Sequence, residues 1–364
     1  RQEQHLGSFR RWMEPLGVRV VWLTGRHKGR RRDERLVALK SGEAPIVVGT
    51  HALFSDDVLF GRLGLVIIDE QHRFGVHQRM ALRRKAEAGG VYPHQLIMTA
   101  TPIPRTLAMT AYADLDLSII DELPPGRTPV KTVAIADTRR GEVVERVEAA
   151  AAQGRQVYWV CTLIEESEAL QCQAAEDTSV LLAEALPGLR IGLLHGRMKA
   201  NEKEGVMMAF KEGEVDLLVA TTVIEVGVDV PNASLMIIEN AERLGLAQLH
   251  QLRGRVGRGS SQSSCVLMYN PPLGDLARQR MEIMRQTNDG FHIAEKDLEL
   301  RGPGEILGTR QTGVLAFRVA DLARDADLLK LIPPAAGTLL QKHPARADKL
   351  IRRWMGDSAR FAGV

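Results

Sequence analysis

The sequence lacks the features that mark several classes of protein. Aromatic residues make up only 4% of its 364 residues, so a surface built mainly on stacked rings is not expected. The three cysteines, Cys161, Cys172 and Cys265, form no CxxC pair, which argues against a disulfide framework or a zinc ribbon and suits a reducing, cytoplasmic location. No apolar run approaches the roughly 18 residues that cross a bilayer, and no signal peptide opens the chain, so membrane attachment is not expected.

The charge balance excludes a strongly basic or acidic protein. Lys and Arg number 48 against 45 Asp and Glu, so the net charge is only +3. Any affinity for a polyanion must therefore come from local basic patches rather than from a field over the whole molecule. One such patch is the run RHKGRRR at 26–32. It could contact phosphates or form the solvated start of a helix, and both interpretations stay open.

Short β-rich runs alternate with helical patterns over most of the chain. The runs are apolar without the alternation of a half-exposed strand, which is typical of parallel sheets covered by helices on both faces. We therefore predict an α/β protein with two parallel sheets. Strands are expected at 18–23, 46–49, 65–68, 95–98, 132–136, 156–160, 190–194, 217–220, 235–238 and 265–269, and helices at 31–40, 139–153, 164–186 and 202–211.

The length suits two core-forming domains and a smaller part, since domains usually run to roughly 100–200 residues. The segment DELPPGRTP at 121–129 interrupts both periodicities with three prolines and a glycine, so it marks the predicted boundary. After Asn270 the strand pattern ends, and a helical tract, a glycine-studded loop at 301–313 and further helix follow. The predicted domains are 1–125, 126–270 and 271–364.

Polar segments of unusual composition follow the predicted strands. Loops and helix N-termini converge at the carboxyl ends of parallel strands, and ligands bind there. Two sheets with such edges predict a ligand in a cleft between two lobes. The segments are GTH at 49–51, DEQH at 69–72, TATP at 99–102, HGR at 195–197 and TTVIE at 221–225.

The predicted strand within LGLVIIDE, at 63–70, ends in two adjacent carboxylates. Neighbouring residues at a strand end point in different directions, so Asp69 could hold Mg²⁺ beside a nucleotide while Glu70 orients and deprotonates an attacking water. A strand end with two solvated acids is the plain alternative, and for an isolated Asp–Glu pair it would be favoured. The pair does not stand alone in this sequence.

The segment QLRGRVGR at 251–258 is the sharpest signal. Arginines three apart, here Arg255 and Arg258, share a face of a helix, and glycines allow close approach of the backbone. Two such guanidiniums can contact phosphate oxygens from across a cleft, an arrangement worth about 10³–10⁵ in rate. The alternative is an exposed loop that happens to be rich in Arg and Gly. At this composition the fixed positions of the segment would arise by chance in about one chain in a thousand, so we prefer the phosphate-contacting interpretation.

Two weaker signals accompany these segments. In GVDVP, the glycine turn at Gly227 can bring the carboxylate of Asp229 to a ribose hydroxyl, with an ordinary loop as the alternative. His72 follows the two acids and is a candidate to couple them to the rest of the protein. The histidines His51, His72, His195 and His250 are too scattered in sequence to predict a metal site.

In this order, the segments resemble the motifs of superfamily 2 helicases. DEQH is similar to the Walker B motif, TATP to the coupling motif III, ATTVIEVGVDVP to motif V and QLRGRVGR to motif VI. DEQHRFGVHQR at 69–79 resembles the RecG branch-migration helicases, whereas the related transcription-repair coupling factor usually has DEEH there. The stretch at 287–313 resembles the translocation motif that those two families share. The resemblance covers nearly the whole chain.

The resemblance implies two RecA-like parallel-sheet lobes, the first of them partial, and a C-terminal helical hairpin and loop region. It also implies ATP and Mg²⁺ as cofactors, with Asp69 at the metal, Glu70 at the water and Arg258 as the first choice for an arginine finger. The residues that it assigns to the nucleotide are Asp69, Glu70, His72, Gly227, Asp229, Gln251, Arg255 and Arg258.

The function implied is ATP-driven translocation on duplex DNA that remodels replication forks and Holliday junctions in DNA repair and recombination. Branched or duplex DNA and a single-strand-binding protein are the expected partners, and a monomer is expected. For Arg301, packing against the helical hairpin is an equally open role. The residues assigned to coupling are Thr99 and Thr101, and those assigned to DNA contact or translocation are Thr50, His51, Thr222, Arg301 and Arg310.

The sequence departs from the family in two ways. The pattern GxxxxGK[ST], which forms the phosphate cradle, occurs nowhere,, and the family's N-terminal wedge domain is missing too. The chain opens with Arg1 rather than Met, so we expect a fragment. Without the cradle's nest of backbone N–H groups, we expect negligible ATPase activity from the chain alone.

Three other functions stay open at this point. The alternative most similar to the branch-migration helicase is a duplex DNA translocase of the transcription-repair coupling type. A nucleotide-independent DNA-binding module is suggested by the missing cradle. A metal-dependent nuclease using Asp69 and Glu70 is the third, although two adjacent acids make a poor two-metal site.

Overall fold

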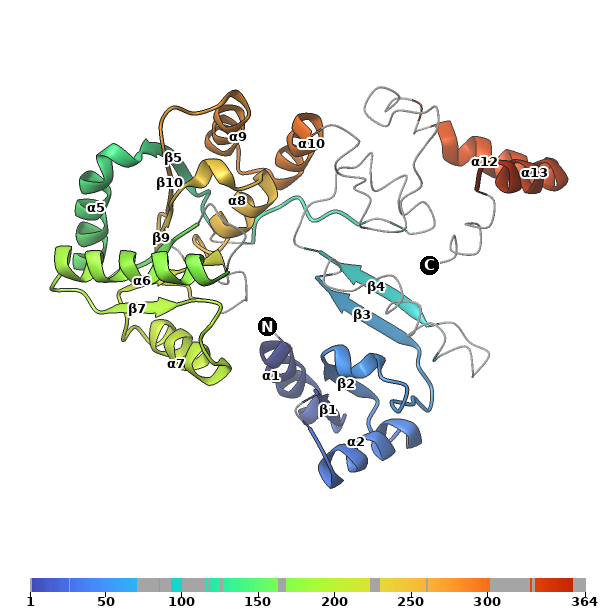
Figure 1. The fold of residues 1–364 in the computed structure, drawn as a ribbon. Helices are drawn as coiled ribbons and strands as arrows, with labels where there is room; N and C mark the ends of the chain where they lie inside the picture. The colour runs from blue at the N-terminus through green and yellow to red at the C-terminus, as the bar shows by residue number, and fades with distance from the viewer. Residues whose placement is uncertain are drawn as a thin grey trace. The chain divides into compact units, whose positions relative to one another are not determined.

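The computed structural model describes most of the chain, in two compact units. The units are Arg1–Ala100 with Gly337–Val364, and Thr101–Ala336; Figure 1 shows their elements. The described residues are 2–25, 27–70, 85, 93–99, 116, 118–124, 127–162, 168–222, 230–259, 261–301, 328 and 331–355.

The first unit contains two short parallel sheets, each of two strands. β1 (Val20–Leu23) pairs with β2 (Ile46–Gly49), and β3 (Leu65–Asp69) pairs with β4 (His94–Met98). Its helices are α1 (Gln2–Met13), η1 (Glu14–Leu16), α2 (Arg30–Ser41), η2 (His51–Phe54) and α13 (Pro344–Met355), while α12 (Ile332–Lys342) crosses the division between the units.

Among the described residues, the strands of the first unit form two small sheets rather than one. β3 buries Val66 and Ile68 against side chains that include Phe60, whereas Leu65 and Ile67 on its other face are 55% and 47% exposed. An apolar run reports that a strand is hydrophobic, but the number of strands in a sheet and the cover of each face depend on segments far away in the sequence.

The second unit is built on a six-stranded sheet in the order β5-β10-β9-β6-β8-β7, with every neighbouring pair parallel. Its strands are β5 (Lys131–Ala136), β6 (Gln156–Val160), β7 (Ile191–Leu194), β8 (Leu217–Ala220), β9 (Ala233–Ile238) and β10 (Ser264–Tyr269). Its helices are η4 (Asp137–Arg139), α5 (Arg140–Ala152), α6 (Glu168–Ala185), α7 (Ala200–Lys211), η6 (Ala241–Arg243), α8 (Leu246–Arg253), α9 (Asp275–Gln286) and α10 (Gly290–Arg301).

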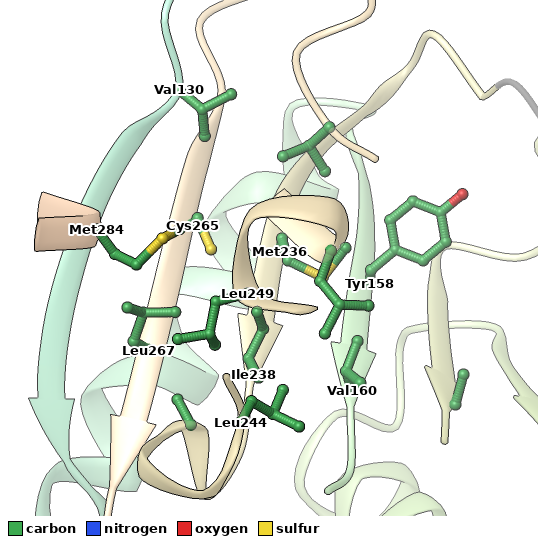
Figure 2. Packing of buried hydrophobic residues seen from close by; sticks show 14 of the residues in the cluster. Val130, Tyr158, Val160, Met236, Ile238, Leu244, Leu249, Cys265, Leu267 and Met284 are labelled. Carbon is green, nitrogen blue, oxygen red and sulfur yellow. The ribbon is translucent and has the colours of Figure 1, made fainter. Parts of the chain in front are cut away.

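Both faces of this sheet are covered. Met236 and Ile238 of β9 pack in one hydrophobic cluster with Leu249 of α8, as Figure 2 shows. Leu235 and Ile237, the alternate residues, pack in a second cluster with α5 and α6. All the residues of β6, β8 and β9 are buried, which explains why these strands read as continuous apolar runs.

The path of the chain explains which helix lies in which layer. From β5 to β6 and on to β7 the chain moves in one direction across the sheet, through α5 and α6. It then reverses and returns through α7 to β8, and later through α8 to β10. Because crossovers between parallel strands are right-handed, a reversal puts the returning helices on the opposite face. Because all six strands are parallel, their carboxyl ends share one edge of the sheet.

The predicted strands are all present, each with its ends within two residues of the prediction. The helices predicted at 31–40, 139–153 and 202–211 are present as α2, α5 and α7, and α6 matches the described part of the helix at 164–186. The helical tract after Asn270 is confirmed as α9 and α10. The glycine-studded loop lies outside the described residues after Arg301, and the three domain boundaries stay predictions.

The cysteines behave as the sequence suggested. Cys161, Cys172 and Cys265 are free thiols, and all three are buried. Complete burial raises the pKa of Cys265 to about 12, so this thiol stays protonated at neutral pH. Of the helices that the structure describes, each is too short or too polar to cross a bilayer.

The core of the second unit gives a stability prediction. Leu249 of α8 is fully buried in the cluster of Figure 2, so Leu249→Ala should lower the free energy of unfolding by about 2–5 kcal/mol through lost burial and the cavity left behind. Leu181→Ala on α6, at a side chain that is 58% exposed, should change it by less than about 0.5 kcal/mol. Urea denaturation followed by circular dichroism measures both, and equal effects would contradict the described core.

Candidate functional site

Two acids leave the carboxyl end of β3, next to the end of β4. The register pairs Asp69 with Met98, so Glu70 and Thr99 follow at the same edge of this sheet. The side chain of Asp69 is 35% exposed, whereas Glu70 is only 8% exposed. The prediction that these polar segments follow the strands is confirmed, and the alternative of two solvated acids is wrong for Glu70.

The backbone at Glu70 is strained. Its φ of 58° lies in the left-handed region, which costs a residue with a side chain roughly 1–2 kcal/mol. Such conformations persist only where the surrounding structure holds them, and they gather at functional sites. The two successive carboxylates differ in environment, since Asp69 is partly exposed and Glu70 is buried, and this difference is compatible with separate roles.

Helix α1 adds a residue that the sequence motifs did not reveal. The Nε2 atom of His5 lies 3.3 Å from Oδ2 of Asp69. The two residues are 64 positions apart, and His5 stands in no pattern with the acids. Only the packing of α1 in this unit identifies it as a neighbour of the candidate metal ligand.

At the end of β2, the structure assigns a local role to one candidate. Gly49 lies so close to the neighbouring strand that an added Cβ would be 2.4 Å from the carbonyl oxygen of Leu23. The hydroxyl of Thr50 then accepts a hydrogen bond of 3.4 Å from the backbone N–H of Ala52 and caps η2. His51 is exposed, with its ring 6.2 Å from that of Phe54. Contact of Thr50 and His51 with DNA stays a prediction.

The basic run at 26–32 contains the start of a helix. α2 begins at Arg30, whose Nε donates to Glu34 at 3.1 Å. Arg32 donates to Asp57 at 2.7 Å, and this hydrogen bond lowers the pKa of the Asp57 carboxyl. Of the two open interpretations, these ion pairs favour the helix start.

In the second unit, two more predicted segments share the carboxyl edge of the sheet. β7 and β8 end side by side, with Leu194 paired to Ala220, so His195 and Thr222 follow at neighbouring strand ends. Nε2 of His195 lies 3.4 Å from Glu176, and Thr222 is half-buried. These positions agree with the strand-end prediction and leave the role of Thr222 untested.

Several candidates cannot be placed. Nothing is described of the side chain of Arg301, although its backbone ends α10. The candidates that lie outside the described residues are His72, Thr101, Gly227, Asp229 and Arg310.

The arginines of QLRGRVGR do not share a helix face, which corrects our expectation. α8 ends at Arg253, and Gly254 is its C-cap. Gln251 is on the helix, but Arg255 and Arg258 lie beyond it in a turn in which Gly257 has a φ of 76°. Spacing by three residues predicts a shared face only while the helix continues, and here the helix ends before both arginines,.

The turn at 254–259, here called the arginine turn, is fitted tightly to its surroundings. A Cβ added to Gly257 would lie 2.9 Å from the side chain of Val130, and one added to Gly259 would lie 2.5 Å from the carbonyl oxygen of Pro231. Arg255 is 8% exposed, and Nε of Arg258 donates to the carbonyl of Gly254 at 3.3 Å. Glycine is therefore required in this turn for close approach, as the sequence suggested.

Arg253, which we did not select from the sequence, ties this segment to the helices that follow. It is 3% exposed, and burial lowers its pKa from the ordinary value. Its Nη1 donates to the carbonyls of Met284 and Thr287, both at 2.8 Å, and its Nη2 lies 3.1 Å from Nδ1 of His250. The guanidinium thus joins α8 to the end of α9 and to the connection that leads into α10.

A second arginine, near the middle of α9, joins this helix to the segment before α8. Nη1 of Arg280 donates to the carbonyl of Leu244 and Nη2 to that of Glu242, both at 2.8 Å. Since η6 and α8 are consecutive, the pair α9–α10 is held at two places on the segment that presents the arginine turn.

The described ranges contain no group of three His, Cys, Asp or Glu side chains arranged to hold a metal ion. The scattered histidines were not expected to form one. The nuclease interpretation of Asp69 and Glu70 accordingly gains no support from the described part of the chain.

Three family models match the chain in succession. Residues 2–110 match the DEAD/DEAH box helicase model, residues 141–260 match the helicase conserved C-terminal domain, and residues 287–351 match "ATP-dependent DNA helicase RecG, domain 3, C-terminal". They follow, in order, the strands of the first unit, the six-stranded sheet and the later helices.

Relatives extend over the full chain. It is 63% identical to "ATP-dependent DNA helicase RecG" of Haemophilus influenzae and 62% identical to that of Escherichia coli K12, in both cases over 100% of this chain and 52% of the relative. A solved structure, "Structure of RecG bound to three-way DNA junction", is 42% identical with a TM-score of 0.68, over 90% of this chain and 42% of that one. The chain spans about half the length of the curated relatives it matches.

These matches first define a class: the chain has the RecA-like α/β fold of superfamily 2 helicases, built on parallel sheets. The similarity to curated helicases over the whole of this chain then narrows it: the chain resembles RecG helicases throughout, and its C-terminal part matches a RecG family model.

The buried histidine of α8 gives a prediction about pH. Burial, and then the charge of Arg253, lower the pKa of His250 from 6.5 to about 4. Between these values the unfolded chain binds the proton and the folded chain does not, so stability is lost as pH falls from about 6.5 to 4, by roughly 3 kcal/mol at most.

His250→Gln keeps an acceptor for Arg253 but cannot titrate, so the variant should lose less stability over this pH range. Thermal melting of the variant and the parent between pH 7 and pH 4 measures the difference. His292→Gln, at an exposed side chain of α10, is the control. The same pH slope in the parent and in His250→Gln would contradict the assignment.

Proposed function

We propose that this chain is the motor part of an ATP-dependent DNA helicase that moves along duplex DNA and remodels forks and Holliday junctions by branch migration, in repair and recombination. Identity of 62–63% to curated RecG helicases over the whole chain carries the proposal. The solved relative bound to a three-way DNA junction supports branched DNA as the partner. A monomeric state, a single-strand-binding protein as a further partner and a cytoplasmic location stay predictions.

The acids at the end of β3 form the first half of the proposed nucleotide site. A half-exposed carboxylate such as Asp69 suits Mg²⁺, which is bound through one or two carboxylates together with the phosphates of the nucleotide. When bound, the ion would offset the charge that develops on the β- and γ-phosphates. Glu70, buried on a strained turn, would orient the attacking water and accept its proton as the general base.

The arginine turn forms the second half. Arg258 is proposed as the finger that stabilises the charge on the γ-phosphate, with Arg255 and Gln251 beside it. A guanidinium stays charged when it is buried and presents its donors in a planar fork. The burial of Arg255 is therefore compatible with a contact to phosphate. Gly227 and Asp229 would complete the site at the ribose, and His72 at the acids.

Coupling to DNA is proposed to run through two routes. Thr99, at the strand end beside Glu70, and Thr101 would link hydrolysis to the first lobe. In the second route, the hydrogen bonds that Arg253 and Arg280 donate would transmit movement of the arginine turn to α9 and α10, and so to Arg301 and Arg310. The candidates for direct contact with the DNA backbone are Thr50, His51 and Thr222.

Arg258→Ala in the natural full-length gene product should lower DNA-stimulated ATPase turnover by about 1,000-fold, because the developing charge loses its cation. Arg258→Lys should recover only a small part, since an ammonium keeps the charge and loses the fork. Affinity for a three-way junction without nucleotide should stay the same in both variants. Turnover near that of the parent in Arg258→Ala would refute the role of the arginine.

A second prediction concerns the chain of 364 residues by itself. It contains no GxxxxGK[ST] pattern, so the β- and γ-phosphates lack the nest of backbone N–H groups that such a loop supplies. We expect no DNA-stimulated ATP hydrolysis above background from this polypeptide in a phosphate-release assay. The full-length gene product is the positive control, and equal turnover by both would overturn the expectation.

A further inference from the structure

Arg127 makes a contact that none of the motifs accounts for. It lies in the proline-rich segment at 121–129, which precedes β5. Its Nε donates to the carbonyl of Gly257 at 3.0 Å, and its Nη2 donates to the carbonyl of Gly254 at 3.4 Å. These two carbonyls flank Arg255 and stand before Arg258, so one guanidinium spans the arginine turn.

The residues after Arg127 support the same turn. Val130 is 7% exposed, and its side chain and the carbonyl of Thr128 would lie 2.9 and 3.7 Å from a Cβ added to Gly257. The backbone N–H of Lys131 donates to Ser263 at 3.0 Å. The arginine turn and the residues after it thus pack against the segment that leads into β5.

The carbonyl of Gly254 connects Arg127 with the proposed finger. It accepts from Nη2 of Arg127 and, at 3.3 Å, from Nε of Arg258. Hydrogen bonds from a charged donor are shorter and stronger than neutral ones. A turn containing three glycines has wide backbone freedom of its own, so contacts from outside must select the one conformation in which Arg258 is presented.

We propose that Arg127 is a positioning residue for ATP hydrolysis: it fixes the backbone of the arginine turn and thereby the place of Arg258. The inference rests on the proposed function, because the position of Arg258 matters only if Arg258 acts on the nucleotide. Arg127 also belongs to the segment predicted to join the lobes.

The test uses the natural full-length gene product and measures kcat and KM for ATP in the presence of a three-way DNA junction. Arg127→Ala should lower kcat by about 10- to 100-fold, as expected for a misplaced catalytic group, with affinity for the junction unchanged. Arg127→Lys, which can reach one carbonyl but not span both, should give an intermediate kcat. Arg139→Ala, at an exposed arginine paired with Glu142, is the control and should match the parent.

A double-mutant cycle separates positioning from a general effect on the fold. If Arg127 acts through Arg258, adding Arg127→Ala to Arg258→Ala should lower kcat by less than about twofold further. A full additional loss of about 10- to 100-fold would show an independent role and overturn the inference.

The remaining outcomes also decide. If Arg258→Ala loses activity while both Arg127 variants turn over like the parent, positioning by Arg127 is wrong and the proposed function stands. If Arg258→Ala is itself fully active, the proposed function fails first. If the melting curve shows that Arg127→Ala does not fold, Arg127→Lys replaces it in the cycle, both alone and combined with Arg258→Ala. A folded Arg127→Lys variant with the kcat of the parent would then overturn the inference.

Discussion

The buried guanidinium of Arg253 is the interaction on which the rest of the second unit depends. A charge taken out of water is costly unless its donors are satisfied, and here they meet the carbonyls of Met284 and Thr287, together with His250. Those carbonyls belong to the last turn and the C-cap of α9, where a helix leaves acceptors without an internal partner and favours a positive charge. One side chain thus satisfies the end of α9 and fixes α8 against it.

The arginine turn inherits its geometry from this anchor and from the entry to β5. Arg253 is the last residue of α8, so the path of the chain beyond it starts from a fixed point. From the other side, Val130 and Pro231 leave room only for glycine at Gly257 and Gly259. The turn that carries Arg255 and Arg258 is therefore defined by its neighbours more than by any preference of its own sequence.

In the first unit the candidate functional residues lie at the ends of short two-stranded sheets. The two acids follow β3, and the strand end beside them is held by pairing with β4. The left-handed conformation of Glu70 is one that local sequence disfavours, so it requires support from the surrounding structure. Strain of this kind costs stability and is typical of functional sites.

The sequence by itself determined the ten strands, the α/β class, the acids at the end of β3 and the arginine segment, because apolar runs and unusual residue patterns are local properties of a chain. It did not determine that Arg255 and Arg258 leave the helix, that His5 lies beside Asp69, that Arg127 contacts the arginine turn, or that Arg253 joins α8 to α9. Their partners lie 64 positions away for His5, 127 and 130 for Arg127, and 31 and 34 for Arg253, and for both arginines these partners are backbone carbonyls. Every residue type carries such a carbonyl, so no pattern of side chains announces the contact, and only the tertiary structure decides which arginine reaches which turn.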